Sequence, residues 1–161
     1  MTHLDNCPNP KHIGAAGLEI IKKWEGLEDG DPSTVNLDPY LDAAGLPTIG
    51  WGHLIKDGED FTGGITIQQA EDLLRQDVKI AERAVNNLVH VHLNQNQFDA
   101  ICSWTFNCGT GALSQSTLLV WLNAARMHDV PQQLTRWNKA GGRSLLGLAR
   151  RRVDESALFL T

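Results

Sequence analysis

Residues 40–53 read Tyr-Leu-Asp-Ala-Ala-Gly-Leu-Pro-Thr-Ile-Gly-Trp-Gly-His, and this stretch decides the fold. The Ala-Gly pair at 44–45 is a turn signal, and the Thr, Ile and Trp residues within 48–51 favour extended structure. The pattern therefore predicts a β-hairpin. An acid, Asp42, and a hydroxyl, Thr48, are carried on this hairpin with five residues between them.

A helix is predicted upstream of the hairpin, and it ends at a second acid. Leu18, Ile21 and Trp24 recur at helical spacing, and Gly26 supplies a helix stop. Glu25 is therefore expected in the last turn of this helix. Residues 26–39 are rich in Asp, Gly, Pro and Ser, which predicts an exposed acidic loop between the helix and the hairpin.

Two carboxylates in unlike settings, Glu25 at a helix end and Asp42 on a hairpin, indicate sugar-cleaving chemistry. Glycoside hydrolysis commonly uses one carboxylic acid to protonate the leaving oxygen and a second carboxylate to direct water or attack the sugar. Each residue alone has a plainer interpretation: a solvated helix-end carboxylate for Glu25, a turn residue for Asp42 and a strand former for Thr48. The catalytic interpretation depends on all three occurring together.

Downstream of the hairpin the sequence predicts helices. Thr66 and Gln69 form a capping-box pattern, and apolar residues then step by three or four as far as Leu88, which predicts a long helix over 67–88. Further helices are expected over 95–107, 116–125, 130–137 and 145–160, separated by glycine-containing segments at 109–111 and 140–142. Core packing is expected for the three tryptophans in these apolar helical segments, Trp104, Trp121 and Trp137.

The fold class is therefore α+β and mostly helical, in a single domain over 1–161. A small lobe with the hairpin is expected at about 13–66, the connecting helix at about 67–88 and a larger helical lobe at about 89–161. The 161 residues are 42% apolar and 20% charged, the composition of an ordinary soluble globular protein.

The N-terminal segment, the histidines and the cysteines bear on whether the protein is exported, binds a metal or forms disulfides. The first dozen residues lack the basic start and apolar run of a signal peptide, and no stretch is long enough to span a bilayer, so we expect a cytoplasmic product. His90 and His92 lack a third ligand at suitable spacing, so we expect neither a metal site nor a cofactor. Free thiols are expected for the three cysteines, Cys7, Cys102 and Cys108.

The formal charge of −5 is unevenly distributed. Residues 1–99 carry 7 Lys and Arg against 16 Asp and Glu, a net −9, whereas residues 100–161 carry 7 against 3, a net +4. The basic half, including Arg136, Lys139, Arg143 and the run at 150–152, could attract an anionic polymer such as nucleic acid or cell wall. A solvated helix face explains the same charges equally well.

Several short motifs follow one another in order along the chain. They are Trp24-Glu25-Gly26, Asp42 through His53, Ile65-Thr66 with Gln76-Asp77-Val78, and the segments 97–100, 106–109, 116–119, 137–143 and 147–152. This ordered set, from about Gly17 to Phe159, resembles the bacteriophage-type lysozymes, the endolysin muramidases of glycoside hydrolase family 24. The resemblance implies a lysozyme-like fold.

The resemblance also implies catalytic roles. Glu25 would be the acid, and Asp42 and Thr48 would handle the attacking water. Sixteen residues separate Glu25 from Asp42, more than is usual in the family, which indicates an insertion in the acidic loop. Whether one of the loop acids has taken a role is open, and the candidates are Glu28, Asp31 and Asp38. Glu25 is favoured because Trp-Glu-Gly at a helix end is the better match.

Residues around these three receive roles by the same resemblance. His53 and Asp77 would form a buried ion pair that ties the hairpin to the long helix, and Arg151 or Arg152 would approach Glu25. We expect substrate binding by three residues of the helical lobe, Phe106 and Asn107, which would line the cleft facing the hairpin, and Arg136.

The expected function is that of an endolysin. It would hydrolyse the β-1,4 bond between N-acetylmuramic acid and N-acetylglucosamine in bacterial peptidoglycan by an inverting mechanism, as a monomer, for host cell lysis. A separate holin would give it passage from the host cytoplasm to the wall, and no nucleic-acid or membrane partner is expected. The alternative is a non-catalytic peptidoglycan-binding module. Nucleic-acid binding is weaker, because the whole chain is acidic.

Overall fold

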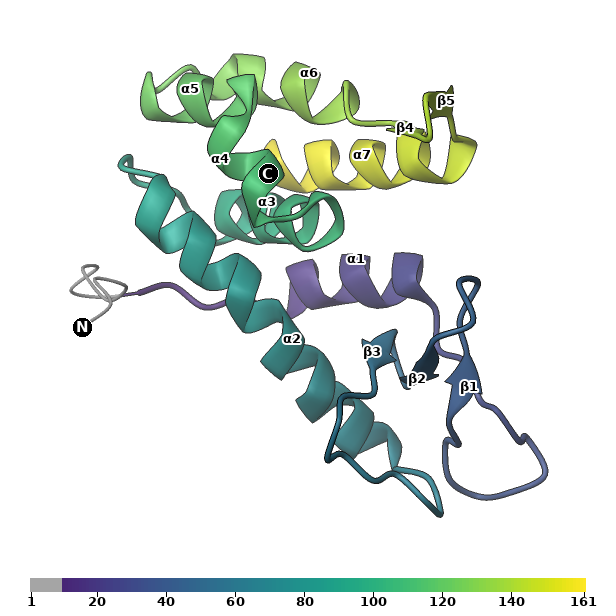
Figure 1. Ribbon diagram of the computed structural model, residues 1–161. Helices are drawn as coiled ribbons and strands as arrows, with labels where there is room; N and C mark the ends of the chain where they lie inside the picture. Colours follow the sequence, from purple (N-terminus) through teal and green to yellow (C-terminus); the bar gives the residue numbers. More distant parts are fainter. Residues whose placement is uncertain (1–9) are drawn as a thin grey trace. The chain divides into compact units, whose positions relative to one another are not determined.

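The computed structural model describes residues 10–161, and the chain divides into two compact units (Figure 1). The smaller unit is Glu25–Asp77, and the larger unit combines the chain up to Trp24 with Val78–Thr161. These boundaries differ from the expected lobes. They fall at the end of the first helix and within the long helix, so both helices contribute residues to both units.

A small antiparallel sheet organises the smaller unit. Its strands are β1 (Tyr40–Leu41), β2 (Pro47–Ile49) and β3 (His53–Leu54), in that order. Tyr40 pairs with Thr48, and Ile49 pairs with His53. The expected hairpin and its turn are confirmed. The core beneath the sheet is formed by Ile49, Ile65 and Ala70, with Leu37, Trp51, Ile55, Phe61 and Leu73 packed against them.

The long helix α2 spans Ile67–Leu88, as the sequence predicts. Its capping box is present: the Gln69 N–H donates to Thr66 Oγ1 at 3.1 Å, and the Thr66 N–H donates to Gln69 Oε1 at 2.8 Å. The apolar residues at helical spacing are buried, namely Ala70, Leu74, Val78, Ala81 and Val85.

The acidic loop at 26–39 is folded on itself. Asp29 Oδ1 accepts from the N–H groups of Asp31 and Asp38, at 3.1 and 3.0 Å. Asp31 in turn accepts from Ser33, and Asp38 accepts from the Thr34 hydroxyl. Asp31 and Asp38 therefore have structural partners within the loop, which weakens the case for either as a catalytic acid.

Helices build the larger unit. It contains α1 (Ala15–Glu25) up to Trp24 and, beyond α2, the helices α3 (Gln95–Cys108), α4 (Thr110–Gln115), α5 (Thr117–Asn123), η1 (Met127–Asp129), α6 (Val130–Thr135) and α7 (Leu146–Phe159). Figure 1 shows α7 between α3 and α6, and both pack against it. The fully buried side chains of this core include Ile101, Trp104, Leu118, Leu122 and Leu134.

Two elements of the larger unit were not expected from the sequence. Gly109 and Gly111 suggested a break, but Gly109 only ends α3 and the chain re-enters a helix at once as α4. Residues 140–142 suggested a plain separator, but β4 (Lys139–Ala140) and β5 (Arg143–Ser144) pair across them. A two-residue Gly-Gly connection with positive φ at both positions is a hairpin signal, so this element was predictable in principle.

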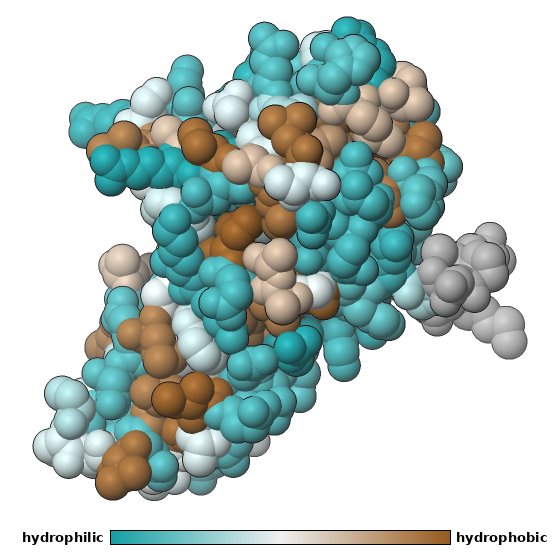
Figure 2. Space-filling view, turned by 180° about the vertical axis from the view of Figure 1, so that it is seen from behind, coloured by the Kyte–Doolittle hydropathy of each residue, from teal (hydrophilic) through white to brown (hydrophobic). Residues whose placement is uncertain are grey.

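The expectation that all three helical tryptophans pack in the core is confirmed for Trp104 and wrong for Trp137. Trp104 is fully buried, whereas Trp137 is 39% exposed and covers Trp104 edge to face, with ring centroids 5.1 Å apart. Trp121 is only half-buried, with the Arg126 guanidinium 4.1 Å from its ring. On the face drawn in Figure 2, hydrophobic residues form separate patches within a largely hydrophilic surface.

Two of the cysteines, and the histidines His90 and His92, lie in the larger unit. Cys102 is buried and Cys108 half-buried, both as free thiols, and Cys7 lies outside the described residues. His90 and His92 lie between α2 and α3. Over residues 10–161, no group of three or more His, Cys, Asp or Glu side chains is arranged to hold a metal ion. None of the helices described has the length and apolar character needed to cross a membrane.

Candidate active site

Glu25 is the last residue of α1, as predicted, and is half-buried. The helix stops there because Gly26 adopts φ +74°, a left-handed conformation that suits glycine. The Glu25 carboxylate lies beside the turn between β2 and β3. A methyl group placed on Gly52 of that turn would lie 3.7 Å from Glu25 Oε2. Glycine at position 52 therefore leaves the space next to this carboxylate open.

Asp42 and Thr48 are held by the peptide groups of one residue, Leu46. Asp42 Oδ1 accepts from the Leu46 N–H at 2.9 Å and from the Ala44 N–H at 2.8 Å. The Thr48 hydroxyl donates to the Leu46 carbonyl at 2.8 Å. Both N–H groups donate to the same oxygen of Asp42, Oδ1. The single hydroxyl proton of Thr48 is used in the bond to the Leu46 carbonyl, so Thr48 Oγ1 can only accept a further hydrogen bond. The hairpin thus fixes a carboxylate and a hydroxyl on either side of the same residue.

The predicted ion pair between His53 and Asp77 is confirmed, and a third member was not expected. His53 Nδ1 lies 2.9 Å from Asp77 Oδ2, and His53 Nε2 lies 3.0 Å from Glu59 Oε2. The imidazole is 3% exposed. A carboxylate only accepts hydrogen bonds, so both contacts are hydrogen bonds only when both ring nitrogens carry a proton. His53 therefore links β3, α2 and the 56–60 loop through contacts with two carboxylates.

Glu59→Gln is expected to lower the melting temperature at pH 7 and to have little effect at pH 3. The Lys56 N–H and then His53 donate to the Glu59 carboxylate, and these bonds lower its pKa in the folded protein. A lowered pKa stabilises the fold above the ordinary glutamate pKa of about 4.3, and this contribution is lost as the pH falls through the folded value. Thermal unfolding between pH 3 and 7 measures it.

Asp57→Asn is the matched control for this prediction, because Asp57 is an exposed acid of the same loop. It should leave the difference between pH 7 and pH 3 as in the unmodified protein. An equal loss of melting temperature in Glu59→Gln at both pH values would contradict a role for the Glu59 charge.

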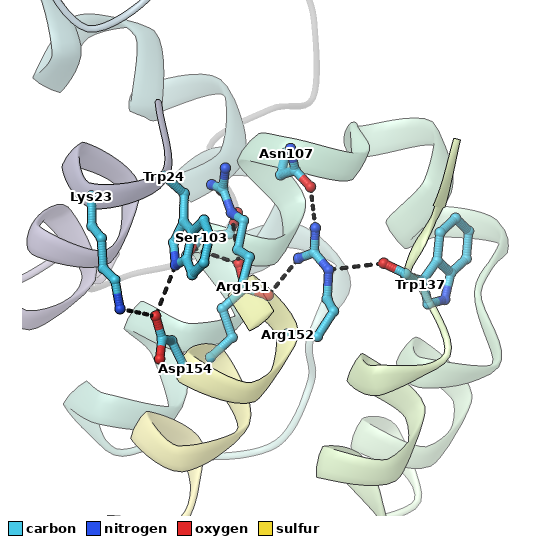
Figure 3. Close-up of polar contacts among 9 residues, drawn as sticks. Lys23, Trp24, Ser103, Asn107, Trp137, Arg151, Arg152 and Asp154 are labelled. Atoms are coloured by element: carbon cyan, nitrogen blue, oxygen red, sulfur yellow. Dashed lines mark hydrogen bonds and ion pairs between the residues drawn. The ribbon is translucent and has the colours of Figure 1, made fainter. Parts of the chain in front are cut away.

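A buried charged cluster lies on α7, where the sequence suggested a solvated face (Figure 3). Arg151 Nε donates to Glu155 Oε1 at 3.2 Å, and the Ser103 hydroxyl donates to the same oxygen at 2.8 Å. Arg152 donates to the other Glu155 oxygen and to the carbonyl of Trp137. Burial raises the pKa of the Glu155 carboxyl, and the two guanidinium groups oppose that shift. The solvated-face interpretation is therefore wrong for Arg151 and Arg152 and holds for Arg150, which is exposed.

A second contact ties the end of α1 to α7. Asp154 Oδ2 accepts from the Trp24 indole N–H at 2.8 Å and from Lys23 Nζ at 2.7 Å, as Figure 3 shows. Lys23 also lies 5.0 Å from the centroid of the Trp24 ring. The residue before Glu25 is thereby fixed within the larger unit.

The three expected substrate-binding residues all lie in the larger unit. Phe106 is half-buried on α3, and Asn107 is exposed with its side-chain oxygen accepting from Arg152. Arg136 is exposed just after α6, with Nη1 3.5 Å from Gln133 Oε1. It lines an open pocket together with Trp121, Gln132, Gln133, Thr135 and Asn138.

The smaller unit contains five of the site residues predicted from the sequence, namely Glu25, Asp42, Thr48, His53 and Asp77. The prediction missed Glu59, Asp154 and Glu155. Glu155 follows Arg151 and Arg152 at helical spacing, so an ion-pair pattern could have indicated it. Glu59 and Asp154 leave no such local signal. The expected approach of Arg151 or Arg152 to Glu25, and of Phe106 and Asn107 to the hairpin, stay predictions.

The chain is similar in sequence to several known proteins. The Phage lysozyme family model matches residues 22–155. The chain is 40% identical to the endolysin of Salmonella phage P22 over 152 residues, covering 92% of this chain and 98% of that one. It is 39% identical to the endolysin of Bacillus phage B103 over 150 residues, 93% of this chain, and spans about half (54%) of that relative's length.

Solved structures of similar proteins share the fold of this chain. A mutant of P22 lysozyme superposes with a TM-score of 0.80 at 36% identity, covering 94% of this chain and 99% of that one. The muramidase domain of SpmX from Asticaccaulis excentricus superposes with a TM-score of 0.76 at 38% identity, with the same coverage of 94% and 99%. The fold is therefore lysozyme-like.

Proposed function

Because this chain belongs to the phage lysozyme family, we propose that it is an endolysin that hydrolyses bacterial peptidoglycan. The bond cleaved is the β-1,4 linkage between N-acetylmuramic acid and N-acetylglucosamine. Glu25 is the general acid that protonates the leaving oxygen, and Asp42 and Thr48 bind and orient the attacking water. These roles follow from the residues' chemistry and from their match to the family's motifs.

The observation that supports this proposal best is the shared anchoring of Asp42 and Thr48 on Leu46. Asp42 Oδ1 is held by two backbone N–H groups, so we assign the attacking water to Oδ2. A water that donates one hydrogen bond to Asp42 Oδ2 can donate the other to Thr48 Oγ1, whose own proton is directed at Leu46. Both protons of the water are then directed to the protein, and a lone pair is left for attack.

The mechanism proposed is inversion in a single displacement. An inverting enzyme needs its two carboxyl groups about 6.5–9.5 Å apart so that a water fits between one of them and the sugar. Inversion at a β-linked sugar releases the α-anomer first. Proton NMR of the reducing end during hydrolysis distinguishes the outcomes, and early accumulation of the β-anomer would contradict inversion.

Substrate binding is proposed for the larger unit. Trp121 offers part of an aromatic face, and Arg136 offers a guanidinium suited to carboxylates of the wall polymer. Phe106 and Asn107 provide a further aromatic surface and an amide. These groups match a polymer that combines sugar rings with acidic substituents.

The test of the function uses purified peptidoglycan. Reducing ends should appear, and borohydride reduction followed by acid hydrolysis should convert the new ends to muramitol. Glucosaminitol in its place would reassign the bond that is cleaved. Sedimentation with peptidoglycan without release of reducing ends would favour the alternative, a non-catalytic wall-binding module.

Access to the wall is a separate proposal. By analogy with the family's usual arrangement, the enzyme would accumulate in the host cytoplasm and pass the membrane with the help of a separate holin, acting as a monomer. Expression in bacteria without a holin should leave the cells intact until the membrane is permeabilised by chloroform. Lysis before permeabilisation would contradict this route.

A further inference from the structure

Tyr40 lies in β1 of the smaller unit, close in the fold or in the sequence to two of the proposed catalytic groups. It pairs across the sheet with Thr48, and Asp42 follows it by two residues along the same segment. The Tyr40 side chain is half-buried, so its position is set by packing as well as by the strand.

The Tyr40 hydroxyl contacts the turn between β2 and β3. It donates to the Gly50 carbonyl at 3.3 Å. Gly50 and Gly52 adopt φ +63° and +76°, left-handed conformations on either side of Trp51. A turn with two glycines can adopt many backbone conformations when nothing restrains it, because glycine has the most conformational freedom of any residue. A hydrogen bond from Tyr40 therefore restricts a turn whose sequence alone leaves it loose.

The same turn forms the surface beside the Glu25 carboxylate, since Gly52 is the residue that a methyl group would bring to 3.7 Å from Glu25 Oε2. A displacement of the turn toward Glu25 would close this space, and a displacement away from it would admit water. Gly52 thus forms part of the surface against which the carboxyl packs.

The surroundings of Tyr40 raise the pKa of its phenol. Burial raises the pKa of the phenol, and the carboxylates of Glu28, Asp42 and Glu25 raise it further, whereas a hydrogen bond with the Gly52 backbone opposes the shift. Tyr40 is therefore a neutral hydrogen-bonding group throughout the working range. A neutral phenol with a raised pKa is a poor proton donor for catalysis, so its role is geometric.

We propose that Tyr40 is a positioning residue for the general acid: its hydroxyl holds the turn at residues 50–52 against β1, and that turn sets the place of the Glu25 carboxyl. This inference rests on the proposed function, because it takes Glu25 as the acid. Tyr40 need not touch the sugar in this role. Its loss should therefore affect the chemical step and leave substrate binding unchanged.

The test is Tyr40→Phe, which removes one oxygen and keeps the ring. We expect kcat for peptidoglycan hydrolysis to fall about five- to tenfold with KM within about twofold, the size of effect expected from one lost hydrogen bond. Amide hydrogen exchange at Gly52 should become faster in the same variant. Thr62→Val is the matched control, because it removes a hydroxyl that bonds Asp60 elsewhere in the same unit, and it should leave kcat unchanged.

A double-mutant cycle tests whether Tyr40 acts through the turn. Gly52→Ala strains the turn and adds a methyl group beside Glu25, whereas Gly58→Ala has similar strain, at φ +89°, and no atom within 4 Å of the added carbon. The effects of Tyr40→Phe and Gly52→Ala on kcat should be less than additive, because both disturb one element. The effects of Tyr40→Phe and Gly58→Ala should be independent.

Each result has a defined meaning. Absence of hydrolysis by the unmodified protein overturns the proposed function and this inference together. An active protein whose Tyr40→Phe variant keeps full kcat, or keeps the original exchange rate at Gly52, overturns the positioning role alone. Additive effects of Tyr40→Phe and Gly52→Ala overturn it as well.

Discussion

Glu25→Gln is expected to lower kcat for peptidoglycan hydrolysis about 10²–10⁴-fold, the contribution typical of a positioned general acid. Glutamine keeps the size and hydrogen-bonding shape of the side chain but has no acidic proton for the leaving oxygen. Binding to insoluble peptidoglycan should persist, because the substitution removes a proton donor and not the binding surface. Loss of turbidity of permeabilised bacteria, together with release of reducing ends, measures the rate.

Glu28→Gln is the control for this experiment. Glu28 is an exposed acid at the start of the same loop, three residues along the chain, and we assign it no catalytic role. Its substitution should leave the rate nearly unchanged. An active Glu25→Gln variant combined with an inactive Glu28→Gln variant would move the acid into the inserted loop.

Glu155→Ala is expected to cause the largest loss of stability, about 3–5 kcal/mol, because it leaves two buried guanidinium groups without their shared carboxylate. Glu155, Arg151 and Arg152 are between 0% and 3% exposed. A buried charge is costly when it loses the carboxylate that compensates its desolvation. For a chain of this size the loss corresponds to a fall of about 6–20 °C in melting temperature, which calorimetry measures.

Two further variants define the origin of that loss. Glu155→Gln keeps most of the side-chain volume and removes only the charge, so it should lose nearly as much stability as Glu155→Ala. Asp129→Asn breaks the more exposed pair between Arg126 and Asp129 and should cost less than about 1 kcal/mol. A stable Glu155→Gln variant would show that the loss in Glu155→Ala comes from a cavity and not from removal of the carboxylate charge.

The acidic loop at 26–39 is held both by short-range hydrogen bonds and by a contact with a distant residue. Its abundance of Asp, Ser, Thr and Asn predicts a loop, and these residues form short-range bonds to backbone N–H groups, as at Asp29 and Asp31. Leu37 then pairs with Ile65 and packs on the core of the smaller unit. The loop is therefore anchored by one apolar residue whose partner lies far along the chain.

Predictions from the sequence were wrong where a residue's contacts lie far along the chain, or where a residue type such as glycine occurs in more than one kind of structure. Gly109 marks a helix end and not the end of helical structure, so the re-entry into α4 was missed. The arginine run was expected to be solvated because charged residues usually are, but Glu155 on α7 is a buried partner of both Arg151 and Arg152. Trp137 was expected in the core because it ends a predicted helical segment, yet its flanking residues Arg136 and Asn138 are polar, and it forms the exposed cover over Trp104.

Local sequence patterns predict the helix that ends at Glu25, the hairpin carrying Asp42 and Thr48, and the capped helix that brings Asp77 to His53. Each depends on contacts between residues close in the chain, which spacing and capping chemistry describe. Only the tertiary structure decided that Glu59 completes the pairing of His53, that Arg151 and Arg152 are buried, and that the Tyr40 hydroxyl meets the turn beside Glu25. Those contacts depend on which distant segments of the chain pack together, and a local sequence pattern does not contain that information.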